Sequence, residues 1–211
     1  MKNLLILLLL GVSYTSIQAQ MKDKISLEGC YGLSIPINFV STKSNANFNS
    51  TSHLGGGIRY MFNQNIGIKG ELSYDKFSAN NTDLGMNSTG INTQIYYNLG
   101  KLVGLVYVTN ETLGLFVHSG FGLVINKSLN NINSDRAGVY CIGLTPLFKL
   151  SHQFALSSDF SYKMGFKQNL CFDGTFSPNS TLVNNNLSTF TITLGAIYYL
   201  GDSKYHADWS R

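Results

Sequence analysis

Charged side chains are scarce in this sequence, and most of those in its alternating segments share one parity. They make up 12% of the chain, against about 25% in soluble domains. Residues of the same parity in a strand lie on the same face. The face that carries most of these charges is called the inward face here. Its four acids and four bases are Glu28, Arg59, Lys69, Glu71, Asp75, Lys149, Asp159 and Lys163. Because charges removed from water need partners to offset desolvation, this balance predicts a self-neutralised interior network. Its candidate members are Glu28, Arg59, Lys69, Glu71, Asp159 and Lys163.

Residues that could perform catalysis or bind a metal are dispersed. His118 and Ser119 are adjacent, yet successive strand residues point to opposite faces, so they cannot act as a nucleophile and its base. His53 is predicted at a loop edge and His118 in the lumen, whereas His152 is predicted in a turn and His206 in the tail. No His/Asp cluster has metal-ligand spacing. We therefore expect no catalytic residue, no metal site and no cofactor, with a lipid-modifying barrel enzyme as a secondary alternative.

The cysteines and the net charge exclude further classes. Cys30, Cys141 and Cys171 are odd in number and show no CxxC spacing, so neither a disulfide framework nor a zinc site is indicated. Without Lys2, 14 basic residues face 11 acidic ones, and they are scattered along the chain. This excess is too weak to predict binding to nucleic acid.

Alternating hydrophobicity predicts the elements that position these residues. In Thr189–Leu200 one face is apolar and the other small and polar, and twelve residues can cross a bilayer when tilted. The same pattern predicts strands at Ile25–Ile37, Leu54–Phe62, Ile66–Phe77, Ile91–Leu99, Leu113–Ile125, Gly138–Leu150, Gln153–Phe166 and Thr189–Leu200. We predict an all-β fold, an eight-stranded antiparallel up-and-down transmembrane β-barrel. A β-sandwich would explain the alternation equally well, but not the low charge.

The predicted connections alternate between long and short, as in outer-membrane barrels. Long polar loops are expected at Ser41–Ser52, Ala79–Ser88, Asn126–Arg136 and Lys167–Leu187, with tight turns at Asn63–Asn65 and Ser151–His152. Gly100–Thr112 is the exception: it is either a strand extension or an apolar segment at the membrane surface. The long loops would face the cell exterior, where extracellular ligands could contact them.

The chain begins with the features of a secretory signal. Lys2 precedes the apolar run Leu4–Val12, and a polar stretch follows with an expected cleavage after Ala19. We therefore expect a cleaved signal peptide at 1–19, a barrel at 20–201 and a short periplasmic tail at 202–211. The predicted location is the outer membrane of a Gram-negative bacterium, with outer-membrane lipid as partner.

Three segments carry a family resemblance: QIYYNLGKLVG (94–104), LGLFVHSGFGL (113–123) and YYLGDSKYHADWSR (198–211). The chain resembles the N-terminal barrel of OmpA-like proteins, an outer-membrane β-barrel family of Gram-negative bacteria. In such proteins a basic segment containing His-Ala-Asp-Trp leads into a periplasmic peptidoglycan-binding domain. Because this sequence stops at Arg211, we expect the barrel alone, without cell-wall tethering. The resemblance also implies a long connection after the fourth strand.

These observations favour a non-enzymatic envelope protein with a structural or surface-interaction role. An eight-stranded barrel has a lumen that side chains can fill, so we expect a mostly plugged interior. The main alternative is a narrow pore for small solutes. Paired interior charges would favour the plug, whereas an open water column lined by them would favour the pore.

Overall fold

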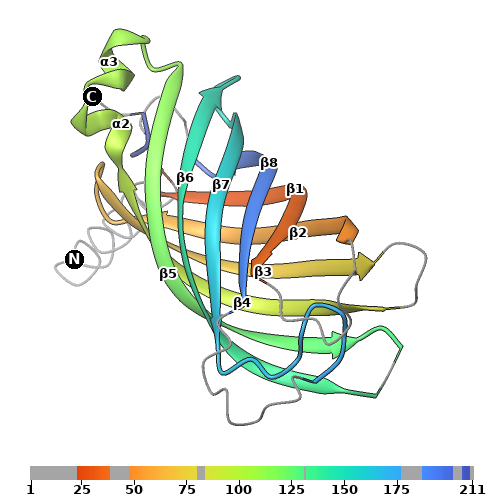
Figure 1. Cartoon of the computed structure of the whole chain (residues 1–211). Helices are drawn as coiled ribbons and strands as arrows, with labels where there is room; N and C mark the ends of the chain where they lie inside the picture. The colour runs from red at the N-terminus through yellow and green to blue at the C-terminus, as the bar shows by residue number, and fades with distance from the viewer. Residues whose placement is uncertain are drawn as a thin grey trace, which may run out of the picture.

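The eight predicted strands form a closed barrel. The structure is a computed structural model that describes residues 23–38, 48–79, 84–130, 132–176, 187–201 and 206–209. Neighbouring strands pair antiparallel, and pairing of the first with the last closes the sheet (Figure 1). The strands are β1 (Ile25–Asn38), β2 (Phe48–Met61), β3 (Ile66–Ala79), β4 (Gly85–Asn98), β5 (Leu113–Ser128), β6 (Ser134–Lys149), β7 (Phe154–Phe166) and β8 (Ser188–Tyr199). The predicted fold class is confirmed. In the part of the chain described, no helix has the length and apolar character needed to cross a membrane.

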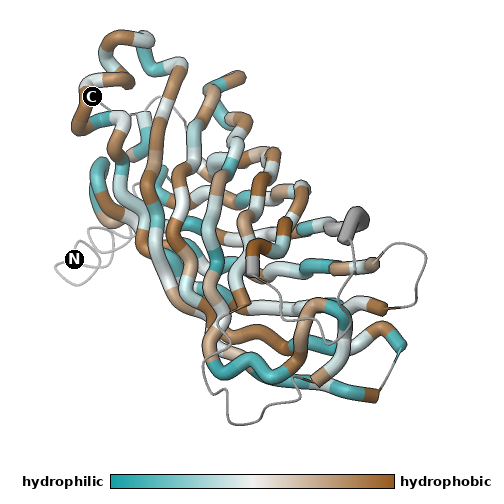
Figure 2. Tube along the Cα trace, in the orientation of Figure 1, coloured by the Kyte–Doolittle hydropathy of each residue, from teal (hydrophilic) through white to brown (hydrophobic). Residues whose placement is uncertain are grey.

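The two faces of the sheet differ as the alternation predicted. Leu72 and Leu194 face outward and are 66% and 70% exposed, whereas the inward Phe116 is 1% exposed. Figure 2 shows hydrophobic and hydrophilic residues alternating along the strands. In a β-sandwich the large apolar side chains would instead meet in a shared core. Their outward direction therefore excludes the sandwich alternative.

Several strands continue beyond their predicted ends at the edge that carries the long connections. β2 begins at Phe48, β4 begins at Gly85, and the β5–β6 pair extends to Ser128 and Ser134. The predicted loops Ser41–Ser52, Ala79–Ser88 and Asn126–Arg136 were therefore too long. Backbone pairing persists where the outward face has become polar, so the outward apolar pattern ends before the ladder does.

The connection after β4 is helical, which excludes the strand extension, one of the two alternatives for Gly100–Thr112. It contains α2 (Leu99–Leu102) and α3 (Leu105–Val108). The Asn98 side chain caps α2 by accepting from the Lys101 backbone N–H at 3.0 Å. Gly104 separates the helices with φ of 73°, a left-handed conformation that suits glycine. Four apolar residues stay exposed: Leu102, Val103, Tyr107 and Val108. Their position at the membrane surface stays a prediction.

The two ends of the barrel differ. The turn end carries the short turns after β2 and β6 together with α2 and α3, and the loop end carries the other connections (Figure 1). Residues His206–Trp209, predicted in the tail, are buried. Tyr199 at the end of β8 is also fully buried, and its hydroxyl donates a hydrogen bond to Asp208.

A cluster of buried apolar residues lies near each end of the barrel. The turn-end cluster contains Met61, Tyr96, Phe116, Leu147, Ala155, Ile197, Tyr199, Ala207 and Trp209. The loop-end cluster contains Phe77, Met86, Leu170, Phe172 and Leu187. Three of these last residues come from the predicted polar loop Lys167–Leu187, so part of that loop packs against inward-facing strand residues. The interior between the clusters holds the charged side chains.

Candidate functional site

Strand register brings four of the six predicted residues together. Arg59 on β2 stands opposite Lys69 on β3. Gly57 on β2 stands between Glu28 on β1 and Glu71 on β3. A Cβ at Gly57 would lie 2.5 Å from the Gly70 oxygen and 3.0 Å from Lys69 Cε. The glycine therefore leaves the space that the Lys69 side chain occupies.

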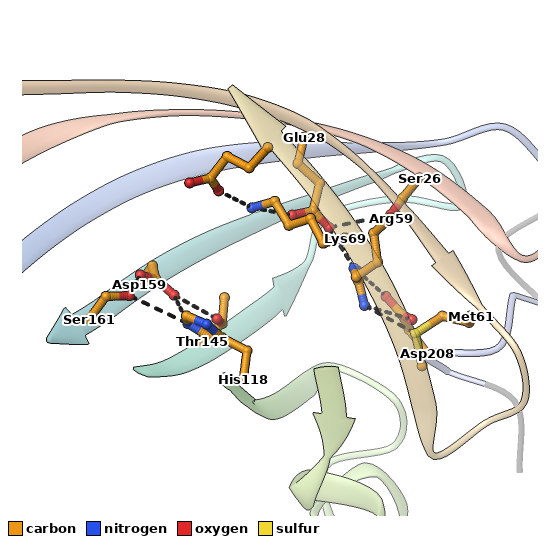
Figure 3. A network of polar contacts seen from close by, with 11 residues as sticks. Ser26, Glu28, Arg59, Met61, Lys69, His118, Thr145, Asp159, Ser161 and Asp208 are labelled. Atoms are coloured by element: carbon orange, nitrogen blue, oxygen red, sulfur yellow. Dashed lines mark hydrogen bonds and ion pairs between the residues drawn. The ribbon is translucent and has the colours of Figure 1, made fainter. Parts of the chain in front are cut away.

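These four residues form a continuous chain of ion pairs. Lys69 Nζ lies 2.7 Å from Glu71 Oε2 and 3.0 Å from Glu28 Oε2. Arg59 Nε donates to the other Glu28 oxygen, Oε1, at 2.6 Å. Figure 3 shows Glu28 between Lys69 and Arg59. Each charge therefore faces at least one opposite charge at hydrogen-bond distance.

Asp208 extends this chain toward the turn end. Arg59 Nη1 and Nη2 lie 3.1 and 2.7 Å from its two carboxylate oxygens, the bidentate geometry typical of strong Arg–carboxylate pairs (Figure 3). The Tyr199 hydroxyl donates to Asp208 Oδ2 at 3.1 Å, and the Asn98 amide donates to the Asp208 backbone oxygen at 3.3 Å. Both side chains of the pair are at most 1% exposed. The sequence prediction missed Asp208 because it placed this residue in a tail beyond the barrel.

Aromatic rings cover the cations of the chain. Arg59 Cζ lies 4.8 Å from the Phe116 ring centroid and 5.5 Å from that of Tyr96. Lys69 Nζ lies 5.7 Å from the Tyr96 centroid. These distances fall within the range of cation–π attraction. The network is thus packed against the turn-end apolar cluster.

Asp159 belongs to a second group, separate from the ion-pair chain in Figure 3. His118 Nε2 lies 2.8 Å from Asp159 Oδ2, and the Thr145 hydroxyl donates to the same oxygen at 2.7 Å. The Ser161 hydroxyl donates to the other carboxylate oxygen. His118 comes from β5, Thr145 from β6, and the remaining two residues from β7.

This second group lacks the geometry of a Ser–His–Asp triad. In a triad the histidine contacts serine through one ring nitrogen and aspartate through the other. Here His118 Nε2 faces both Asp159 and Ser161, the latter at 3.4 Å, while Nδ1 has no hydrogen-bond partner among the described residues. Ser119 points outward and donates to the Tyr140 hydroxyl at 3.0 Å, which confirms that His118 and Ser119 occupy opposite faces.

Lys163 belongs to a third group nearer the loop end. Its Nζ lies 3.9 Å from Asp75 Oδ2, a longer contact than those of Lys69. Asp75 also contacts His53 Nδ1 at 2.7 Å and accepts from the Ser34 hydroxyl. His53 was predicted at a loop edge. It lies within β2 and is 2% exposed, because that strand begins earlier than predicted.

Two cavities among the described interior residues are small. One cavity of ≈ 30 Å³ lies among Glu28, Glu71, Asp159 and Lys163. A second of ≈ 40 Å³ lies toward the loop end, between Asp75 and Phe172. Since one water requires about 10–15 Å³ measured in this way, each cavity has room for only a few water molecules. Both are far smaller than a continuous water column.

Few other metal-binding or nucleophilic groups are found in the described ranges. No group of three or more His, Cys, Asp or Glu residues there could hold a metal ion. Cys30, Cys141 and Cys171 are free thiols. Cys171 lies in the connection after β7, where burial raises the pKa of its thiol to about 11. A thiol that stays protonated at neutral pH is a poor nucleophile.

Comparison with known proteins agrees with this architecture. The model of the outer membrane protein beta-barrel domain matches residues 4–199. The chain belongs to this family. The resemblance to small OmpA-like barrels is thereby confirmed, and the protein is an outer-membrane β-barrel protein. No curated protein matches the sequence significantly.

Solved structures support the fold at low sequence identity. Neisserial surface protein A is 9% identical, with a TM-score of 0.53, and the match covers 83% of this chain and 96% of that one. A major outer membrane protein from Thermus thermophilus is 11% identical, with a TM-score of 0.52 and coverages of 83% and 98%. At these identities the likeness concerns the fold alone.

Proposed function

We propose that this protein is a non-enzymatic, non-conducting barrel with a structural and surface-interaction role in the outer membrane. The observation that supports this best is the pairing of interior charges between two apolar clusters. Glu28, Arg59, Lys69, Glu71 and Asp208 contact one another at 2.6–3.1 Å. Such an interior links neighbouring strands, and an open channel would need these contacts to separate.

A pore for small solutes is less well supported. A solute entering from the turn end would have to displace Trp209 and then break the Arg59–Asp208 pair. Separating one partner from a buried pair costs about 3–5 kcal/mol. At the loop end Leu170 and Phe172, each at most 2% exposed, pack against Phe77 and Met86. The same contacts that seal the interior therefore oppose passage.

A lipid-modifying activity also lacks support. His118 and Ser161 face the interior and are 3% and 4% exposed, on the side of the sheet away from lipid. A lipid carbonyl would have to cross the sheet or enter through an apolar cluster to reach them. The Ser161 hydroxyl also donates a hydrogen bond to Asp159, whereas a nucleophilic serine donates to the histidine that acts as its base.

The loop end is better suited to contact with other molecules. The β5–β6 hairpin extends beyond the outward apolar rows, and Ile132 at its tip is fully exposed. Exposed connections on a rigid scaffold are common binding elements. We therefore propose extracellular ligands, contacted through the loops, and the surrounding lipid as partners of this protein.

Solute flux into proteoliposomes tests the closed interior. Liposomes containing the refolded full chain should swell in isotonic arabinose no faster than protein-free liposomes, while a sixteen-stranded porin serves as the positive control. Protein-dependent swelling would favour the pore.

The non-enzymatic role is tested separately. Lipid A from cells expressing the wild type or Ser161→Ala should show identical masses. An acyl change present only with the wild type would contradict the non-enzymatic role.

A further inference from the structure

The outward face of the barrel carries very few charges, and they share one sign. Among the described strand residues, the outward-facing charged side chains are Lys76 on β3, Lys127 on β5 and Arg136 on β6. All three lie near the loop end, and Lys167, directly after β7, is also exposed there. Lys76, Lys127, Arg136 and Lys167 are called the outer basic cluster below.

The register places these cations close together. Lys76 and Lys127 both stand opposite Asn87 on β4, one from each side. Two strand spacings put their backbones ~10 Å apart. Arg136 stands opposite Ile125, two residues from Lys127, so the two side chains are diagonal neighbours at ~7–8 Å. Long flexible side chains at these spacings can converge on one phosphate group.

The cluster begins where the outward apolar rows end. On β5 the exposed row of Phe121, Leu123 and Ile125 is followed by Lys127. On β3 Leu72 and Tyr74 are followed by Lys76. Such a boundary corresponds to the headgroup level of a bilayer. Cations there would face lipid headgroups rather than acyl chains.

A groove leads from the cluster into the apolar band. Its volume is ≈ 530 Å³, and its walls include Leu72, Ile91 and Leu123, with Arg136 and Lys167 also lining it. The outward residue Thr89 is small and also lines this groove, which leaves a hollow between larger neighbours. An apolar groove beside exposed cations is complementary to an acyl chain attached to an anionic headgroup.

Acidic residues do not compensate these cations. The described strands carry no outward-facing Asp or Glu, and the nearby Asp135 accepts from the backbone N–H groups of Asn169 and Leu170. No side-chain ion pair of the four cations is found within the described ranges. We propose that the outer basic cluster and its groove bind a phosphorylated lipid of the surrounding leaflet.

Native mass spectrometry of the full chain in neutral detergent tests this site. The probes are dioleoyl phosphatidic acid and dioleoyl phosphatidylcholine. The wild type should retain the phosphatidic acid preferentially, and Lys127→Gln/Arg136→Gln should weaken that binding by roughly tenfold or more. Lys24→Gln/Lys101→Gln removes the same charge at the turn end and should leave it unchanged. Equal affinity for the two lipids, or equal losses in both double variants, would overturn the proposal.

A groove variant separates a lipid site from a simple anion site. Thr89→Phe fills the hollow with a side chain suited to a lipid-facing strand, so it should weaken binding of phosphatidic acid while all four cations remain. Glycerol 3-phosphate, which lacks acyl chains, should compete poorly. Full competition by glycerol 3-phosphate together with unchanged binding to Thr89→Phe would overturn the assignment to a lipid. Heat-modifiable electrophoretic mobility checks that each variant is folded.

Discussion

Arg59 is 1% exposed, and its guanidinium is nevertheless satisfied from two directions. Nε contacts Glu28, and the two terminal nitrogens contact Asp208. The planar group presents its donors in a fixed fork, so it can join a carboxylate on a strand to one in the tail. Removing either carboxylate leaves a buried cation with an unpaired donor.

Substitutions at this pair should be strongly and non-additively destabilising. We expect Arg59→Met and Asp208→Asn each to lower the free energy of unfolding by about 3–5 kcal/mol. The first variant leaves the Asp208 carboxylate buried without the guanidinium, and the second removes the bidentate partner of Arg59 and leaves it only the Glu28 ion pair among the described residues. Urea unfolding in detergent micelles measures this. The double variant should cost much less than the sum. Lys76→Met, an exposed control, should stay within about 0.5 kcal/mol of the wild type. Additive losses would show that the pair does not act as a unit.

His206 should make stability depend on pH. Burial lowers the pKa of its imidazole below the usual 6.5, and Nδ1 accepts from the Asp208 backbone N–H at 3.3 Å. The unfolded chain therefore binds a proton at His206 more readily than the folded protein does. The contribution of the neutral imidazole to stability is complete above about pH 6.5 and is lost as the pH drops toward the lowered pKa. The unfolding midpoint of the wild type should decrease over this window relative to His206→Gln. Parallel pH profiles would contradict the assignment.

The residues of the interior were only partly predictable from sequence. Parity sorted Glu28, Arg59, Lys69 and Glu71 onto one face, and adjacent strands then brought them together. Contacts across the lumen depend on the curvature and stagger of the cylinder, which parity does not encode. This is why Asp159 and Lys163 join other groups. Asp208 follows the last alternating segment, so no periodicity marked it as an interior residue.

At the scale of elements, the sequence predicted strand centres better than strand ends. Apolar alternation stops at the lipid boundary, whereas backbone pairing in β2, β4, β5 and β6 continues beyond it. The helical connection had local signals in the Asn98 cap and Gly104, but its apolar run fitted no single period. Within Lys167–Leu187, Leu170 and Phe172 stood in a polar context that indicated an exposed loop.

The connection after β7 should stabilise the loop end of the barrel. Phe172 is 2% exposed, and its ring centroid lies 4.7 Å from that of Phe77. We expect Phe172→Ala to cost about 3–5 kcal/mol of stability, the range for a buried phenylalanine. Phe176, four residues away and 46% exposed, provides the matched control, and its alanine variant should lose far less. Thermal unfolding followed by circular dichroism compares them. Equal losses would contradict the packing of Phe172 at the barrel mouth.

At the scale of the whole molecule, the two faces of one sheet meet different environments. Its outward face meets lipid with apolar side chains, and its inward face replaces water with paired charges and aromatic rings. An eight-stranded cylinder is narrow enough for side chains to fill. In the proposed closed barrel, the turn-end and loop-end clusters would separate the polar interior from both aqueous sides. We therefore predict that the interior charges of this membrane protein line no continuous aqueous path.

Single-channel recording tests the closed interior most directly. The refolded full chain, inserted into planar bilayers in 1 M KCl, should produce no current steps above the protein-free background. Insertion is verified independently by protease protection in matched liposomes. Stable, reproducible open-channel steps from the inserted wild type would contradict a sealed interior and favour a pore.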